Sequence, residues 1–236
     1  ILSAARELVY MRWMGFDKTG KIVPVKPHLF SPTGLLDDTW WHRTYWQYGT
    51  WMSGGFGGWP RAAQQAPAGR IMVVTDDAIL AFGRSKYDAG NGGSVSAGHI
   101  GVGKDNYQVS GLVDHPSNPY RLFSAKKTAS PAAAGRRRRS VVKYNWEKPV
   151  AILVRAMVLA DKTLFIAGPL AGKDNHGLKQ LASAQSGLLQ AVSALNGKKL
   201  AEHKLPAAPV FDGMAAVSGR LYISCADGSV SCMAGD

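Results

Sequence analysis

The fold is decided by two stretches near the C-terminal end of the chain, AMVLADKTLFIAG at residues 156–168 and GMAAVSGRLYISC at residues 213–225. They align without a gap. Apolar side chains coincide at three pairs of positions: Met157 with Met214, Leu164 with Leu221, and Ile166 with Ile223. In each copy, two short runs of strand-forming residues flank a polar turn, which predicts a β-hairpin.

The hairpin recurs elsewhere in the chain. GRIMVVTDDAILAFG at residues 69–83 resembles GRLYISCADGSVSCM at residues 219–233, and a weaker copy is RELVYM at 6–11 followed by FDKTGK at 16–21. The unit is about 40–50 residues long once insertions are removed, which is the size of a propeller blade. A blade is a four-stranded antiparallel sheet that packs radially against its neighbours. The alternative is an ordinary β-sandwich whose hairpins happen to be alike.

We therefore expect an all-β chain that forms a single β-propeller segment over residues 1–236. This segment is expected to be an incomplete ring or a fragment of a ring. The part-blades are expected near residues 1–27, 68–84, 149–205 and 206–236. Long insertions are expected at 28–67 and 85–140, because these segments do not follow the repeat. Good helix formers predict a short surface helix over 177–186, and the chain returns to the blade as a strand over 188–194.

The composition excludes several classes of protein. Hydrophobic residues make up 46% of the 236 residues, too many for a wholly disordered chain. Two cysteines are too few for a disulfide scaffold. The best candidate for a membrane span, residues 150–160, is short and is broken by Arg155, so we expect no membrane span.

DKTGK at residues 17–21 and ALNGKKL at residues 194–200 carry a family resemblance. The strand–turn–strand units with these turns are similar to the repeats of PQQ-like (quinoprotein-like) β-propellers, and the chain resembles the C-terminal part of large bacterial, planctomycete-type PQQ-like repeat proteins. The resemblance implies a tryptophan that docks between blades shortly after each turn. Here the corresponding positions hold Ala201 and Pro24. It also implies an extracytoplasmic, periplasmic location.

The quinoprotein dehydrogenases of this family have vicinal cysteines, a calcium site made of Glu, Asn and Asp, and a catalytic Asp. Cys225 and Cys232 are not vicinal, and no stretch matches the calcium site. We therefore expect a non-catalytic binding or scaffold protein, with no cofactor and no metal site, whose ligand or protein partner is recognised by the loop insertions. The alternative is a quinoprotein-like oxidoreductase, using PQQ and calcium, whose cofactor site lies in a missing N-terminal region.

Five of the seven tryptophans lie between residues 40 and 59. Tryptophan, tyrosine and arginine anchor many binding sites and stack on planar or sugar rings. The candidate binding residues in this segment are Trp40, Trp41, His42, Arg43, Tyr45 and Trp46. They favour a protein or carbohydrate-like ligand, whereas the alternative is that the indoles fill a core between blades.

The chain is basic, with a formal net charge of +12. Its one dense cluster is an arginine run, and these four residues are the second set of binding candidates: Arg136, Arg137, Arg138 and Arg139. The run lacks interleaved aromatic residues, so it favours a solvated loop over a nucleic-acid site. We expect the partners to be a protein or carbohydrate-like ligand, or the rest of this chain or another subunit that completes the propeller.

The two cysteines flank the Asp227–Gly228 turn. A two-residue turn there would place Cys225 opposite Val230 and Cys232 on the same face, about 7–8 Å away. That spacing exceeds comfortable disulfide reach. The sequence thus predicts two free, buried thiols.

Overall fold

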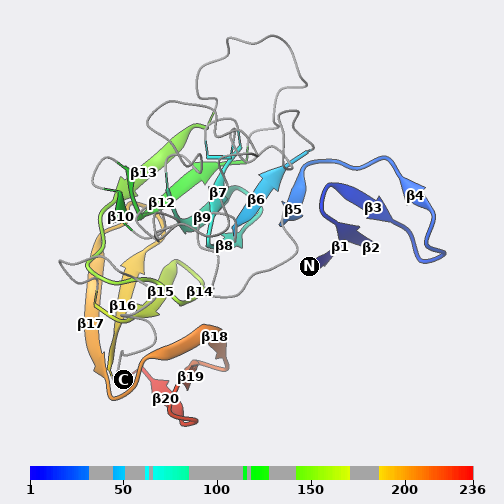
Figure 1. Ribbon diagram of the computed structural model, residues 1–236. Coiled ribbons are helices and arrows are strands. Elements are labelled where there is room, and N and C mark those ends of the chain that lie inside the picture. The colour runs from blue at the N-terminus through cyan, green and yellow to red at the C-terminus, as the bar shows by residue number, and fades with distance from the viewer. Residues whose placement is uncertain are drawn as a thin grey trace, which may run out of the picture.

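The computed structural model describes residues 1–31, 45–50, 62–63, 66–84, 114–115, 118–127, 142–170 and 186–235. Within these residues every regular element is a β-strand, and all sheets are antiparallel (Figure 1). The all-β expectation is therefore confirmed. The sheets that the structure describes do not close into a ring. No helix suited to crossing a membrane occurs in this part of the chain.

The chain forms its sheets in sequence order. The first sheet has the strand order β1-β2-β3-β4, with bounds β1 (Leu2–Ala5), β2 (Leu8–Met11), β3 (Met14–Phe16) and β4 (Ile22–Val23). The second has three strands, β5 (His28–Phe30), β6 (Trp46–Gly49) and β7 (Ala68–Gly69). Thus the segment 28–67, which we expected to be an insertion, contributes strands β5 and β6.

Three further sheets follow. The third has the order β13-β12-β9-β8, built from β8 (Ile71–Val74), β9 (Ala78–Gly83), β12 (Arg121–Lys126) and β13 (Tyr144–Lys148). The fourth is β14 (Ala156–Ala160), β15 (Thr163–Gly168), β16 (Gly187–Ser193) and β17 (Lys199–Leu205). The fifth has three strands, β18 (Pro209–Val217), β19 (Arg220–Cys225) and β20 (Val230–Ala234). A small ladder joins β10 (Asp114–His115) to β11 (Asn118–Pro119). The segment 85–140, the other expected insertion, therefore contributes β10, β11 and the inner strand β12 of the third sheet.

The hairpins expected from the repeat are present as β14–β15 and β18–β19. The strand expected at 188–194 is present as β16, and both of its ends lie one residue earlier than expected. The helix expected over 177–186 lies almost wholly outside the described residues.

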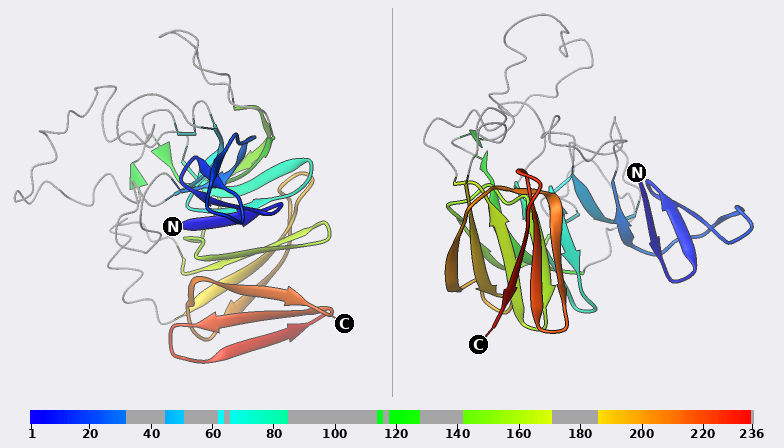
Figure 2. Two further views of the ribbon diagram at one scale, coloured as in Figure 1. Left: turned by 90° about the vertical axis from the view of Figure 1, so that its right-hand side faces the viewer. Right: turned by 90° about the horizontal axis from the view of Figure 1, so that it is seen from below.

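The third, fourth and fifth sheets stack face to face, and the fourth sheet shows why (Figure 2). Successive side chains on a strand point to opposite faces. In β15, Leu164 and Ile166 pack into the core shared with the third sheet, whereas Phe165 and Ala167 pack into the core shared with the fifth. A sheet covered on both faces needs apolar residues at nearly every position, which is what the TLFIAG run of β15 supplies.

The third and fourth sheets share details beyond strand order. Both begin with a hairpin whose turn has two residues, 76–77 in the third sheet and 161–162 in the fourth. Both also have a register shift at the same place, between Ser124 and Ala125 in β12 and between Ala191 and Val192 in β16. Trp146 of β13 pairs with Ser124, and Ala201 of β17 pairs with Ala191. When the two sheets are aligned on their hairpins, Trp146 and Ala201 occupy the same position.

The cysteine prediction is half wrong. Both thiols are free and Cys225 is buried, but Cys232 is exposed. The turn has three residues instead of two, because Gly228 adopts φ +85° and the Cys225 amide bonds to the Ser229 carbonyl at 2.9 Å. The register therefore moves by one residue, which turns Cys232 to the opposite face of the sheet.

Candidate binding pocket

Only two of the sequence-predicted site residues lie among the described residues. Tyr45 is fully buried and packs with Ala62, Ala63 and Ala68, so its ring belongs to a small core. Trp46 is half-buried and pairs with Gly69 in the second sheet. The others lie outside the described residues: Trp40, Trp41, His42, Arg43, Arg136, Arg137, Arg138 and Arg139.

Trp146 joins the third sheet to the fourth. Its side chain is 9% exposed, and its indole Nε1 donates a hydrogen bond to the Ala194 carbonyl oxygen at 2.9 Å. Beneath the ring lies Gly197, whose φ is +71° and where an added Cβ would stand 2.6 Å from the indole Cε3. A residue without a side chain is required here both by the backbone conformation and by the ring above it.

The sequence alone did not identify Trp146. The resemblance implies a docking tryptophan shortly after a Gly-Lys turn, and no such turn precedes Trp146. The signal that could have found it is the YNWEK run, in which one large apolar residue stands between polar neighbours on an edge strand.

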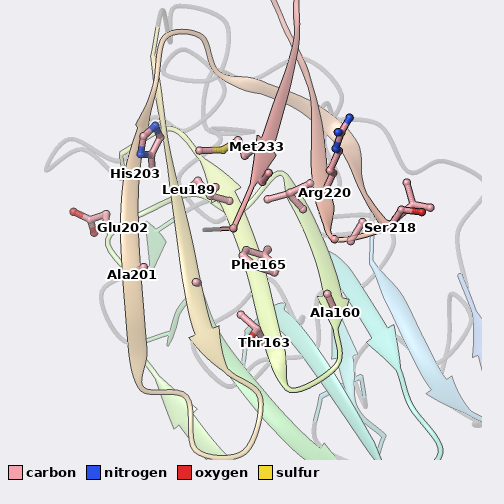
Figure 3. Close-up of a pocket in the computed structure, with 17 residues that line it drawn as sticks. Ala160, Thr163, Phe165, Leu189, Ala201, Glu202, His203, Ser218, Arg220 and Met233 are labelled. Carbon is pink, nitrogen blue, oxygen red and sulfur yellow. The ribbon is translucent and has the colours of Figure 1, made fainter.

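A pocket occupies the corresponding place between the fourth and fifth sheets (Figure 3). Its volume is about 630 Å³, which lies within the range of small-molecule and side-chain binding sites. Ala201 and Gly235 line it, and by register they correspond to Trp146 and Ala194 of the preceding sheet pair. The space that an indole fills between the third and fourth sheets is therefore open between the fourth and fifth.

The walls of the pocket are largely apolar and its rim is polar. Phe165 and Met233 point into it in Figure 3, whereas the Glu202 carboxylate points away. The complete lining is Ala160, Thr163, Phe165, Leu189, Ala191, Ala201, Glu202, His203, Ala216, Val217, Ser218, Gly219, Arg220, Leu221, Met233, Ala234 and Gly235. Such a cavity suits a bulky apolar group whose outer end remains near water.

Glu202 is the one carboxylate among the described residues that line the pocket. Hydrogen bonds from Lys199 Nζ at 3.0 Å and Gln190 Nε2 at 2.9 Å lower the pKa of the Glu202 carboxyl, with the Lys199 bond the larger cause. Glu202 is therefore ionised and engaged within its own sheet. The other charged rim residue, Arg220, is exposed.

The open side of the pocket lies along two edge strands, β17 and β20. Residues of antiparallel strands alternate between pairs that exchange hydrogen bonds and pairs whose backbone groups point outward. Because Cys225 bonds to Ser229, the outward positions on β20 are Val230, Cys232 and Ala234. No other described strand pairs with them.

Buried arginines form a second group, in which Arg70 directly precedes β8 and Arg84 directly follows β9 of the third sheet. Arg70 is fully buried with its guanidinium 5.1 Å from the centre of the Phe211 ring. Arg84 lies at the same distance from the Tyr120 ring. Burial raises the pKa of the Tyr120 hydroxyl, and the two nearby arginines oppose this. These groups are enclosed in the packed interior, so we assign them to the stability of the sheet stack.

No group of three or more His, Cys, Asp or Glu side chains placed to hold a metal ion occurs among the described residues.

Comparisons with known proteins identify no family. No family model matches the sequence, and no curated protein matches it. Among solved structures, the chain is similar to the crystal structure of the computationally designed Ika8 protein, with 8% identity and a TM-score of 0.36 over 98% of this chain and 69% of that one. A TM-score this low supports no argument about fold or function.

Proposed function

We propose that this chain is a non-catalytic binding protein, built from blades of a PQQ-like β-propeller, and that its partner site is the pocket between the fourth and fifth sheets. The observation that carries the proposal is the open space beside Ala201, where the preceding sheet pair holds the indole of Trp146.

Three features favour blades over the two facing sheets of a sandwich. The sheets follow one another along the chain as antiparallel meanders. The first strands of consecutive sheets are neighbours, β8 beside β14 and β14 beside β18. Trp146 packs on the Gly197 turn of the next sheet, which is the kind of contact that the resemblance to PQQ-like repeats implies.

The binding site can be tested with indole as a probe. In protein labelled with ¹³C at the methionine methyl groups, saturable shifts of the Met233 resonance are expected as indole is added. Met72 packs in a different core, which contains Phe123 and Val142, and serves as the internal control. Ala201→Trp should abolish the Met233 shift because the new indole fills the pocket. A Met233 resonance that does not respond to indole, or responds equally in Ala201→Trp, would refute the site.

A further inference from the structure

We propose that the partner is an acidic, extended protein segment that adds to β20 as a fourth strand and places an aromatic side chain in the pocket. This inference rests on the proposed function, because it assumes that the pocket is a partner site. It adds the conformation of the partner, its charge and the residue that anchors it.

The first argument is the open edge of the fifth sheet. The third and fourth sheets end in charged strands, β13 with Glu147 and Lys148, and β17 with Lys199 and Glu202. Charged residues on an edge strand protect it against pairing with another chain. Strand β20 has the sequence VSCMA, with no charged residue and no proline, and the side chain of its first residue, Val230, is 63% exposed.

The backbone of β20 is also placed to pair. Val230, Cys232 and Ala234 direct their N–H and C=O groups away from β19, so the open edge presents a regular row of donors and acceptors. An added strand gains affinity from these main-chain bonds and specificity from the pockets that receive its alternate side chains.

The second argument is the aromatic anchor. The pocket is bounded by Met233 and Ala234 of β20 and by Ala201 of β17, so a strand paired with β20 lies across its open side. Residues directly opposite each other on paired strands share a face. The partner residue opposite Met233 therefore points its side chain into the pocket, beside Met233 and Phe165. Thioether–aromatic contacts are favourable, and the equivalent space is occupied by an indole in the preceding sheet pair.

The third argument is charge. Arg220 on β19 is the one Lys or Arg residue among the described residues that line the pocket, and it is exposed. The opposing charge, Glu202, is already bonded to Lys199. The chain as a whole carries a net charge of +12. An acidic segment complements this surface, and its association should weaken as salt screens the attraction.

The test uses a fluorescein-labelled heptapeptide of alternating glutamate and threonine with tryptophan at its centre, followed by fluorescence anisotropy. The matched peptides replace the tryptophan with alanine or the glutamates with lysine. Each replacement should weaken binding about tenfold or more, the scale expected for losing a buried anchor or reversing the charge.

Two protein variants separate the anchor from the edge. Ala201→Trp should weaken the peptide about tenfold by filling the pocket. Cys232→Pro removes an N–H that points to the open edge and no bond to β19, so it should weaken the peptide equally while the urea midpoint stays unchanged. Cys232→Val keeps the N–H and is the control, with affinity expected within about twofold of the parent protein.

The outcomes distinguish the two proposals. If indole shifts Met233 but the acidic peptide does not bind, or binds Cys232→Pro as tightly as Cys232→Val, strand addition is wrong and the pocket stands. If indole also fails, the proposed function fails with it. Sedimentation that shows self-association of the parent protein, lost in Cys232→Pro, would overturn the acidic partner in favour of a second copy of this chain.

Discussion

Replacing Trp146 with alanine should weaken the packing between the third and fourth sheets. The indole is 9% exposed, lies in the core formed by both sheets, and donates its one hydrogen bond across the boundary to Ala194. Trp146 is the one buried residue of β13, and its neighbours on the strand are exposed or half-buried. The loss should therefore fall on the packing of one sheet against the next.

The magnitude follows from the burial of the ring. Truncating a buried tryptophan to alanine costs about 3–5 kcal/mol. The lost hydrogen bond is part of that cost and is worth about 1 kcal/mol. With a urea m-value of about 2–3 kcal/mol per molar, the unfolding midpoint should fall by about 1–2.5 M.

The assay is urea unfolding followed by far-UV circular dichroism, which reports the strands and not the altered fluorophore. Trp146→Phe is the matched control: it keeps an aromatic ring but no donor, and should lose about 1–2 kcal/mol. The reasoning is refuted if Trp146→Ala lowers stability by less than about 1 kcal/mol, or if Trp146→Phe is as damaging as Trp146→Ala.

Three further outcomes are expected. Gly197→Ala should destabilise by about 2 kcal/mol or more, because its φ of +71° disfavours a side chain and the new Cβ meets the indole; in urea unfolding, a cost below about 0.5 kcal/mol would contradict the contact. Cys232 should react with a thiol reagent in the folded protein and Cys225 only after unfolding, so two equally fast thiols would refute the register of β20. The hydroxyl of Thr19 is the main cause that lowers the pKa of the Asp17 carboxyl, and backbone amides add to it, so the stabilising effect of the Asp17 carboxylate should be present at neutral pH and lost as the pH falls through that lowered pKa. In a carbon-detected NMR titration, Thr19→Val should raise the pKa of Asp17. An unchanged pKa would be evidence against the turn geometry.

Much of the local structure could be predicted from the sequence. The hairpins β14–β15 and β18–β19 follow from short runs of strand-forming residues around two-residue polar turns, since all the information lies within about a dozen neighbouring residues. The glycines of the two Gly-Lys turns, Gly20 and Gly197, both have positive φ, as their place in those turns suggests.

The candidate site was much harder to predict. Its register depends on pairings between strands that are far apart in the chain, such as β9 with β12. The turn after Cys225 shows how small a difference matters: one additional residue moved Cys232 from the expected buried face to the exposed one. The aromatic segment around residues 40–46, which the sequence favours as a binding site, contributes a core residue, Tyr45, where the structure describes it.

The sequence by itself determined that this is an all-β chain of repeated hairpins, because strand periodicity and turn chemistry are local properties. The resemblance to PQQ-like repeats also implied a tryptophan at the position that Ala201 holds. Only the tertiary structure decided that Trp146 fills that place in one sheet pair, and that the next pair has a pocket and an unprotected edge. A cavity exists only between surfaces, so it depends on how two sheets pack and on which strand is last, and neither is written in any single stretch of the chain.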